Sequence, residues 1–320
     1  LYTEELLKLL NIKKIIKSNS PSISQIKIAK ALQICSEEIA SHFLENIYKI
    51  TRAKNIVLSG GFFYNSVFNG KIEKKSKFKK SFISYCPADA GNAMGSALFA
   101  YFNILNKKRF KINNSPYLGT SFKNSEIEKS FKRRRIKFEK INDFSKVVAK
   151  ECYDQKVVGL FRNRMEFGDR ALGNRSIIAD PRFAEMKKKI NDSVKYREPY
   201  RPFAPSVINE KANIFFEFTK GQENNYMERV LKVKKKYRKK LEAVTHFDDS
   251  ARVQTVNKNN NKDFHKILLE FEKLSGIPIL LNTSFNVNGE PVVCSPDDAI
   301  NTFYNSKIDV LIIGDYLVRK

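Results

Sequence analysis

Hydrophobic positions in the first hundred residues form one long helical stripe and two short apolar runs. Apolar residues recur at three- and four-residue steps from Ile28 to Ile47, which predicts a long amphipathic helix with a core-facing stripe. The runs Ile56 to Leu58 and Phe82 to Tyr85 are short and bounded by turn residues, as is typical of buried strands. A second helix is expected from about Gly91 to Phe102. This half therefore alternates strands with helices.

A second alternating set follows a polar connection. Residues 106–125 contain Pro116 and Gly119 but no sustained apolar period, so we place a domain boundary near Asn113. Short apolar runs beyond it predict strands at Val157 to Phe161, Pro205 to Ile208, Arg252 to Val256, Pro278 to Leu281 and Asp309 to Ile313. Helical periodicity predicts a helix from Ser125 to Arg134 and a second one that ends near Gln155. Further helices are predicted at Ala184 to Val194, Lys262 to Leu274 and Pro296 to Tyr304. Both halves, 1–112 and 113–320, are expected to be mixed α/β.

Composition and charge narrow the class of protein. The 320 residues are 42% hydrophobic, enough for two packed domains, and 59 Lys and Arg against 34 Asp and Glu give a net charge of +25. That excess fits nucleic acid, a membrane surface or anionic substrates. The densest basic stretch, residues 220–240, is interpreted as a solvated helix face. No apolar run reaches the roughly 18 residues of a membrane span, and four scattered cysteines suit a reducing compartment, so we expect a cytoplasmic protein without nucleic-acid or membrane partners.

One segment, residues 162–206, combines cations with glycine, proline and apolar residues. Its cationic members are Arg162, Arg164, Arg170, Arg175, Lys195, Arg197 and Arg201. A solvated helix would carry such charges on one polar face, whereas tight-packing residues interrupt them here. Because guanidinium groups are forked donors suited to planar oxyanions, the segment predicts a pocket for an anionic substrate. The alternative is that these arginines form structural ion pairs with neighbouring carboxylates, namely Glu166, Asp169, Asp180 and Glu198.

Weaker candidates lie at the ends of predicted strands. The polar run 282–286 directly follows an apolar strand, so it either faces a ligand crevice or forms a turn with side-chain hydrogen bonds. Gly60 and Gly61 also follow a strand and would admit a nucleotide phosphate, although they match no established phosphate-binding loop. Asp89 precedes a helix and would either cap it or bind a metal ion. Among the three histidines, His246 alone is a candidate for catalysis.

Six segments in order carry a resemblance to a known family. They are LSGGFFYNSVFNGKI (58–72), CPADAGNAMGSAL (86–98), EFGDRALGNRS (166–176), KYREPYRPFAPSV (195–207), THFDDSARVQTV (245–256) and PILLNTSFNVNGEPVVCSPDDAI (278–300). Together they resemble the O-carbamoyltransferase family that includes the nodulation-factor, cephalosporin and tobramycin carbamoyltransferases. The resemblance covers nearly the whole chain and is least specific in the linker and in residues 217–244.

The resemblance implies a fold and a reaction. Residues 1–112 would be the second half of an actin-like (ASKHA) domain that binds metal and nucleotide. Residues 113–320 would be an α/β domain with a twisted mixed sheet, like that of the threonylcarbamoyl-adenylate synthases. Such enzymes transfer a carbamoyl group from carbamoyl phosphate, through carbamoyl-adenylate, to a hydroxyl of a sugar-like or natural-product acceptor. ATP, Mg²⁺ and a further divalent metal such as iron are the implied cofactors.

The matching positions receive roles from the same resemblance. Catalytic roles are implied for Arg170, Lys195, Arg197 and Arg252, and substrate binding for Arg175, Arg201, Asn282, Ser284 and Asn286. The nucleotide loop of the first domain corresponds to Gly60, Gly61 and Asn65, and its metal-binding aspartate to Asp89. A cation-lined pocket suits carbamoyl phosphate, a small labile dianion, because it gathers the anion and offsets repulsion from the ATP phosphates.

Some positions depart from the family pattern. The two histidines that the family places upstream at HxxxH spacing to complete the metal site are absent, so we expect a fragment or a truncated gene. The bulky segment Phe62 to Tyr64 follows the double glycine, Asp169 stands where proline is usual, and Ser250 replaces threonine. Two other functions stay open: a non-catalytic remnant that binds anions or nucleotides, and a component of the machinery that makes threonylcarbamoyl-adenosine in tRNA.

Overall fold

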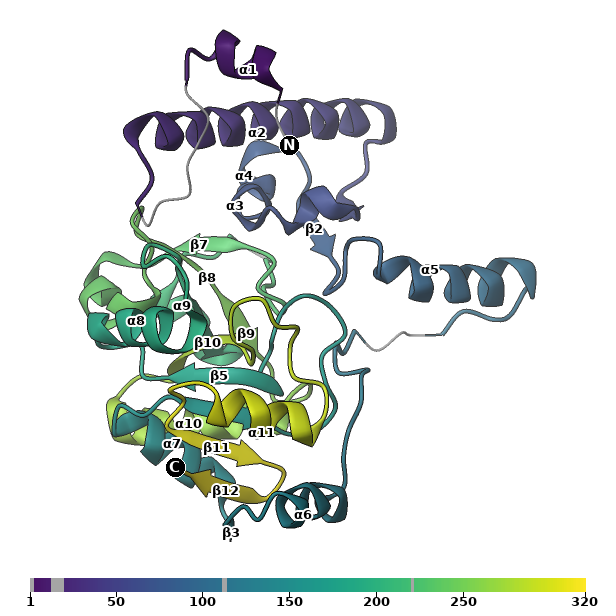
Figure 1. Cartoon of the computed structure of the whole chain (residues 1–320). Helices are drawn as coiled ribbons and strands as arrows, with labels where there is room; N and C mark the ends of the chain where they lie inside the picture. The colour runs from purple at the N-terminus through teal and green to yellow at the C-terminus, as the bar shows by residue number, and fades with distance from the viewer. Residues whose placement is uncertain (1–2, 13–19, 111–113, 220–221) are drawn as a thin grey trace.

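The N-terminal part of the computed structural model is a small layered unit beneath one long helix, α2 (Ile23–Thr51) (Figure 1). The structure describes residues 3–12, 20–110, 114–219 and 222–320. A capping box at Ser22 begins α2, and Arg52 in a left-handed conformation ends it. The other α-helices and strands of this part are α1 (Glu4–Leu9), β1 (Asn55–Leu58), α3 (Ser66–Asn69), α4 (Ile72–Lys75), β2 (Lys80–Ile83) and α5 (Gly91–Phe99), and a π-helical turn, Ala100–Ile104, continues α5. The strands β1 and β2 pair in parallel.

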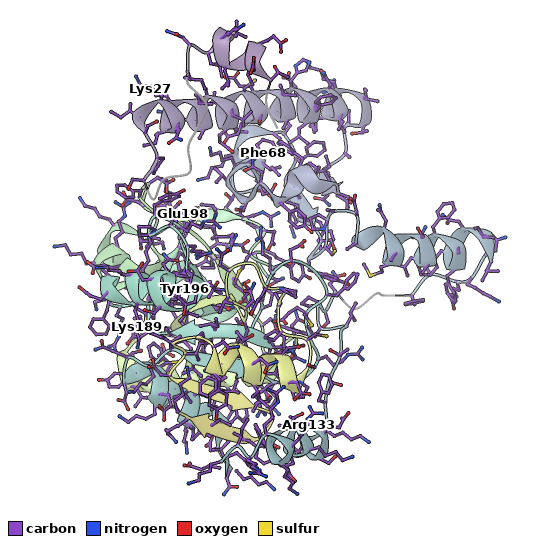
Figure 2. The ribbon with its side chains drawn as sticks, viewed as in Figure 1. Lys27, Phe68, Arg133, Lys189, Tyr196 and Glu198 are labelled. Atoms are coloured by element: carbon purple, nitrogen blue, oxygen red, sulfur yellow. The ribbon has the colours of Figure 1, made fainter. Side chains whose placement is uncertain are left out.

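The long helix was correctly predicted, but its buried face was not. Figure 2 shows Phe68 on the side of α2 that faces the rest of the molecule, where it packs in a core with Leu44. The predicted core-facing residues lie elsewhere on the helix: Leu32 is 68% exposed and Phe43 is 64% exposed. The helix instead buries Glu37, whose carboxylate accepts from lysines of α4 and its N-terminal flank. Hydrophobic periodicity locates an apolar stripe on a helix, but it does not show whether other described segments of the chain pack against that stripe.

The C-terminal part is built on one eight-stranded mixed sheet with the order β3-β12-β11-β4-β5-β10-β6-β9. Its strands are β3 (Glu139–Lys140), β4 (Val158–Phe161), β5 (Arg175–Ala179), β6 (Ala204–Ile208), β9 (Gln254–Val256), β10 (Ile279–Ser284), β11 (Val310–Ile313) and β12 (Tyr316–Arg319). The β11–β4 and β6–β9 pairs are parallel and the others antiparallel. Mixed α/β architecture with a large mixed sheet is therefore established, whereas the actin-like fold of the N-terminal part stays a prediction.

Helices cover this sheet and complete its core. They are α6 (Asn124–Arg133), α7 (Phe144–Tyr153), α8 (Ala184–Ile190), α9 (Ala212–Phe215), α10 (Lys262–Ser275) and α11 (Pro296–Tyr304). Helix α7 packs against α10 and against β4, β5 and β11, while α11 packs against α6, β4 and β11. The central strands β4, β5 and β11 are buried along their whole length, as expected for strands covered by helices.

Two segments differ from their predicted structure. The single strand expected over 252–256 is two strands, because β8 (Ser250–Arg252) pairs with β7 (Val230–Lys232) in a separate ribbon before β9 joins the large sheet. In the basic stretch, the described residues form β7 and a 3₁₀ helix at Lys235–Lys240 rather than one solvated helix. The predicted boundary at Asn113 lies outside the described residues. Over the described ranges, no helix has both the length and the apolar character needed to cross a bilayer.

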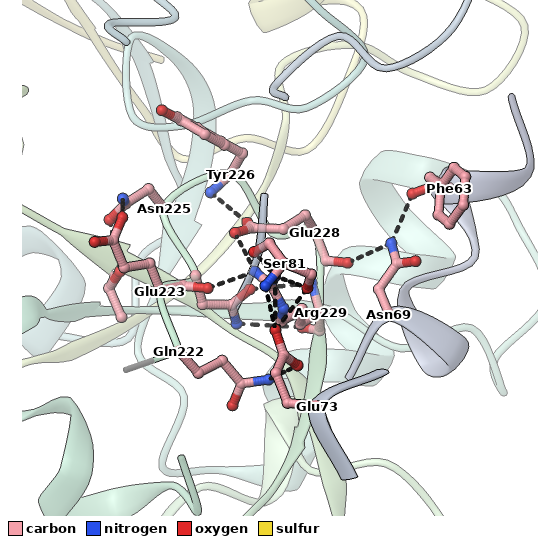
Figure 3. A network of polar contacts seen from close by, with 12 residues as sticks. Phe63, Asn69, Glu73, Ser81, Gln222, Glu223, Asn225, Tyr226, Glu228 and Arg229 are labelled. Atoms are coloured by element: carbon pink, nitrogen blue, oxygen red, sulfur yellow. Dashed lines mark hydrogen bonds and ion pairs between the residues drawn. The ribbon is translucent and has the colours of Figure 1, made fainter. Parts of the chain in front are cut away.

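The two parts of the chain meet through a buried polar network (Figure 3). Arg229, just before β7, donates to the carbonyl oxygen and hydroxyl of Ser81, both at 2.8 Å, and pairs with Glu228 at 2.9 Å and Glu73 at 3.4 Å. The backbones also approach closely, because a Cβ on Gly168 would lie 2.4 Å from the carbonyl oxygen of Tyr85. This contact places α3 beside the C-terminal part, at one wall of the cavity described next.

Candidate functional site

A cavity of about 430 Å³ lies where the carboxyl end of β10 faces β8 and the N-terminal part. Polar residues from both parts of the chain and a few apolar side chains form its walls. The lining residues are Ser66, Val67, Asp169, Arg170, Ala171, Arg197, Arg201, Pro202, Phe203, Met227, Val230, His246, Arg252, Asn282, Thr283 and Ser284. Four of them are arginines, so the fold brings Arg170, Arg197 and Arg201 of the predicted cationic segment together with Arg252 of β8.

Each cation is presented by a different local structure. Arg252 is the last residue of β8, and Arg170 belongs to the loop before β5. Arg197 follows a π-helical turn, Asn191–Lys195, that ends at Tyr196 with φ of 45° and ψ of 50°. That left-handed residue turns the chain sharply, so Lys195 points to the buried side while Arg197 reaches the cavity. Figure 2 shows Tyr196 and its neighbour Glu198 on the part of this domain nearer to α2.

The cavity has an excess of buried positive charge. Burial and the charges of Arg170 and Arg197 lower the pKa of Arg252 to about 9. Its Nε atom is buried without a hydrogen-bond partner in the described part of the chain. Burial likewise lowers the pKa of Arg197 to about 10, and Arg201 adds to the shift while Glu198 opposes it. Like charges that depress one another's pKa values are stabilised by a bound anion, so this cavity is suited to phosphate-type ligands.

Lys195 lies behind the cavity and organises its floor. Its Nζ is within hydrogen-bond distance of both the carbonyl and side-chain oxygens of Ser284, at 2.6 and 3.2 Å, and of Asn286, at 2.9 and 2.7 Å. Burial and the charge of Arg197 lower the pKa of Lys195 to about 7. Lys195 therefore fixes the chain that leaves β10, while Ser284 and Asn282 line the cavity and Asn286 does not.

Arg175 and Arg201 occupy different environments from the other cations. Arg175 does not line the cavity: its buried guanidinium donates to the carbonyl oxygens of Arg162 at 2.8 Å and Thr120 at 3.1 Å, and it stacks on Phe161 with 3.7 Å from its Cζ to the ring centroid. Arg201 lines the rim and pairs with Glu198 at 2.8 Å. The ion-pair alternative therefore describes Arg201, while Arg175 is held by carbonyl groups.

Glu166 and Asp180 have partners away from the cavity, whereas Asp169 lines the cavity, where its charge opposes the lowering of the pKa of Arg170 by burial. Glu166 accepts from backbone N–H groups, including that of Leu172 at 2.6 Å. Asp180 pairs with Arg182 at 2.7 Å. The contacts of Glu166 shape the loop before β5, and that of Asp180 lies just after the end of β5. Neither carboxylate neutralises an arginine of the cavity.

The candidate nucleotide and metal residues of the N-terminal part are less organised for binding. Gly60 has φ of 113° and its N–H donates to the carbonyl oxygen of Pro87, and a Cβ added to Gly60 or Gly61 would point into open space. The side chain of Asn65 caps α3 and exchanges hydrogen bonds with Gln33. Asp89 is exposed and its side chain does not cap α5. No group of three His, Cys, Asp or Glu side chains that could hold a metal ion occurs in the described ranges, and the metal-binding role of Asp89 stays a prediction.

The structure also adds cavity residues that had no assigned role. Ser66 and Val67 come from α3, so the N-terminal part closes the cavity, and Met227 and Val230 come from the ribbon that contains β7. His246, the one histidine named from the sequence as a candidate for catalysis, lines the cavity as well. Its position within a matching motif was the available signal, whereas the contribution of α3 depends on how the two parts pack.

Comparisons with known proteins agree with the positions of these motifs. Residues 5–98 match the family model "Carbamoyltransferase N-terminus" and residues 149–320 match "Carbamoyltransferase C-terminus". Nodulation protein NolNO of Sinorhizobium fredii is 41% identical over 92% of this chain and 44% of its own length. Nodulation protein NolO of Bradyrhizobium diazoefficiens is 38% identical over 92% of this chain and 54% of its own length.

An archaeal relative and a solved structure extend the comparison. The uncharacterized protein MJ1058 of Methanocaldococcus jannaschii is 30% identical over 98% of this chain and 52% of its own length. The chain thus spans about half the length of these relatives. The crystal structure of full-length HypF in the phosphate- and nucleotide-bound form has 18% identity and a TM-score of 0.38, over 55% of this chain and 22% of that chain, too little to carry an argument. The two family models together establish that this chain belongs to the carbamoyltransferase family.

Proposed function

We propose that the arginine-lined cavity binds carbamoyl phosphate and ATP and forms carbamoyl-adenylate, from which a carbamoyl group passes to a small-molecule hydroxyl. The observation that carries this proposal is the convergence of Arg170, Arg197 and Arg252 on one cavity, where burial and the charges of the other two arginines lower the pKa of Arg252. A dianion bound there would relieve that repulsion. Membership of the carbamoyltransferase family supports the choice of carbamoyl phosphate among phosphate-type ligands.

The proposed chemistry needs electrostatic stabilisation more than a protein nucleophile. For the atoms to balance, water takes the phosphoryl group from carbamoyl phosphate, and the freed carbamate oxygen attacks the α-phosphorus of ATP as pyrophosphate leaves. Negative charge then accumulates on phosphoryl oxygens, where fixed guanidinium groups stabilise it without reorganisation. Mg²⁺ would enter as the complex with ATP. No step is assigned to a metal at Asp89, because the described residues there supply no further ligands.

Pyrophosphate release tests the proposal directly. The chain is incubated with carbamoyl phosphate, ATP and Mg²⁺, without threonine, tRNA or an acceptor alcohol. Adenylate formation predicts release of pyrophosphate that depends on carbamoyl phosphate. Silence would favour a binding remnant, and release that requires threonine or tRNA would favour the tRNA-modification machinery.

A variant identifies the site of that activity. Arg170→Ala should abolish pyrophosphate release, because a buried charged donor facing an oxyanion contributes on the order of 3 kcal/mol or more. Arg133→Ala is the matched control, since Arg133 lies on α6 and is largely exposed. Unchanged release by Arg170→Ala would remove this residue from the site.

A further inference from the structure

The arginine-lined cavity also contains two hydrogen-bond acceptors that have no partner. They are the Nε2 atom of His246 and the Oδ1 atom of Asn282, both buried and both unpaired within the described residues. A buried acceptor without a donor has lost its hydrogen bond to water and gained none in return, so each such atom in a native structure needs an explanation. The arginines account for the binding of an anion in this cavity. They do not account for the two neutral acceptors in its walls.

The hydrogen bonds around His246 determine which of its ring nitrogens carries the proton. The hydroxyl of Ser250 donates to Oδ1 of Asp248 at 2.5 Å, a distance typical of a hydroxyl bonded to a carboxylate. The same oxygen, Ser250 Oγ, lies 3.2 Å from Nδ1 of His246. Since the only hydroxyl proton of Ser250 is used on the carboxylate, its oxygen accepts from Nδ1–H. Nε2 is then the unprotonated nitrogen, with a lone pair.

The charge state of His246 agrees with that assignment. Burial lowers the pKa of His246 to about 4, assisted by the charge of Arg252 and opposed by that of Asp248. The ring is therefore neutral at physiological pH and keeps its lone pair at Nε2. A neutral imidazole held by a carboxylate through a hydroxyl is a fixed acceptor rather than another cation.

The orientation of the Asn282 amide is fixed as well. Its Nδ2 lies 3.2 Å from the carbonyl oxygen of Ala171, 3.0 Å from Ser206 Oγ and 3.0 Å from Gln254 Oε1. The hydroxyl of Ser206 donates to Gln254 at 2.6 Å, so Ser206 accepts from Asn282. Every neighbour of Nδ2 is thus an acceptor, which leaves Oδ1 pointing elsewhere without a donor.

Resting on the function proposed above, we propose that Nε2 of His246 and Oδ1 of Asn282 accept the two N–H groups of the carbamoyl amide and so select carbamoyl phosphate over acyl phosphates that lack N–H. Carbamoyl phosphate presents an anionic phosphate to the arginines and an NH₂ group at its other end. The adenine amino group is a second possible donor. It belongs to a neutral base, however, and acceptors set among arginines suit a donor that lies close to a phosphate.

Acetyl phosphate is the matched probe, because it replaces the NH₂ group by a methyl group of similar size and keeps the phosphate. Calorimetry on the full chain without nucleotide should show carbamoyl phosphate bound about 10- to 100-fold more tightly, since the methyl group leaves both acceptors unpaired. His246→Leu should remove most of this preference by weakening carbamoyl phosphate alone. His42→Leu, an exposed histidine on α2, is the control and should retain it.

The relay behind His246 gives an independent test of a positioning role. Ser250→Ala removes the acceptor for Nδ1–H and should reduce the preference for carbamoyl phosphate, whereas Ser250→Thr keeps the hydroxyl and should restore it. Nitrogen NMR of the wild-type ring should show a protonated Nδ1 and an unprotonated Nε2 between pH 6 and 8. A protonated Nε2 would overturn the proposal even if His246→Leu failed to fold.

The remaining outcomes separate this inference from the proposed function. Equal binding of the two phosphates by the wild type, or equal weakening of both in His246→Leu, overturns the inference while pyrophosphate release still supports the function. A clear preference for carbamoyl phosphate without pyrophosphate release supports the role of the two acceptors and overturns the adenylate reaction. Binding of neither ligand overturns both. Weaker binding of ATP, but not of inosine triphosphate, by His246→Leu would assign the acceptors to adenine instead.

Discussion

At the residue scale, the buried arginines of the cavity lower the stability of the folded chain but favour the binding of an anion. Arg252 is surrounded by Arg170 and Arg197, and its depressed pKa shows that the folded chain disfavours its charge when no anion is bound. Arg175 is the more deeply buried of the two, and burial lowers its pKa to about 10, but carbonyl oxygens and an aromatic face hold its guanidinium. Because Arg175 has hydrogen-bond acceptors around it and Arg252 has other cations, the two arginines should respond in opposite ways to removal of their charge.

Substitution of Arg252 tests this contrast. Arg252→Leu should raise the free energy of unfolding by about 1 kcal/mol, because one of three repelling charges is removed, while affinity for anions falls at least tenfold. Arg175→Leu should lower the free energy of unfolding by about 2–4 kcal/mol, because several buried carbonyl groups lose their donor. Thermal unfolding with and without sulfate measures both effects. A destabilised Arg252→Leu variant would contradict the picture of an anion site whose buried cations repel one another.

Lys195 makes anion binding depend on pH. Its pKa near 7 in the free protein lies below the usual value because burial disfavours the charged form. A bound dianion favours that form and raises the pKa, so binding takes up a proton when the pH exceeds about 7. Affinity for sulfate, which stays a dianion throughout, should be greatest below pH 7 and fall by up to about tenfold per pH unit above it.

The control for this pH dependence is Lys195→Met, which fills a similar volume without a titratable group. Its sulfate affinity should be lower at pH 6 and nearly constant between pH 6 and 9. Calorimetry in buffers of different ionisation enthalpy counts the protons taken up. A wild-type affinity that does not change across this range would place the pKa of Lys195 outside it.

At the element scale, the turn after α8 aims two cations in opposite directions. The π-helical residues Asn191–Lys195 and the left-handed Tyr196 place Lys195 inward and Arg197 at the cavity. Arg197 is held there by donation to Asn191 Oδ1 at 2.8 Å and by the ring of Phe203. A regular helix would keep successive side chains about 100° apart along one spiral, so the irregular end is what separates their directions.

Tyr196 carries the strain of this turn and is half exposed, so it can be changed without disturbing a core. Tyr196→Gly should raise the free energy of unfolding by about 1 kcal/mol, because glycine adopts the left-handed conformation without steric cost. Tyr196→Val should lower it and weaken anion binding, since a β-branched residue disfavours this conformation. Chemical denaturation and sulfate titration distinguish the two variants. Equal stability of both would show that the backbone conformation of Tyr196 contributes little.

At the scale of the whole molecule, the cavity depends on contact between the two parts of the chain. Ser66 and Val67 of α3 close one wall, and the network around Arg229 holds the parts together (Figure 3). Within this network burial raises the pKa of Glu228 to about 7, although Arg229 opposes the shift. The network therefore combines charges that are costly to bury with hydrogen bonds that offset the cost.

Breaking this network should separate the parts before the large sheet unfolds. Arg229→Met leaves Glu73 and Glu228 buried without their cation and should cost about 3–5 kcal/mol. Arg133→Met is the matched control: its ion pair with Asp297 is exposed and should contribute less than about 1 kcal/mol. Limited proteolysis should show faster cleavage near Tyr85 only in Arg229→Met. Equal resistance of both variants would show that other contacts hold the parts together.

The sequence by itself determined most elements and the membership of the cationic cluster. Helical periodicity and short apolar runs predicted α2, α10 and β4 because local spacing is sufficient for such elements. It did not predict β5, which begins with a buried arginine, or the division of residues 250–256 between two sheets, since strand pairing depends on partners distant in the chain. The family resemblance of the motifs likewise identified Arg170, Arg197 and Arg252, which the fold brings to one cavity.

Only the tertiary structure decided which of these residues line the cavity and which support it from behind. It placed Arg175 against carbonyl groups and Lys195 behind the floor, and it turned the apolar stripe of α2 away from the core. It also left His246 and Asn282 as unpaired acceptors among cations. Sequence records which chemical groups are available. Burial, partners and direction depend on contacts between distant segments, and these contacts set the charge state and hydrogen-bonding capacity of each group.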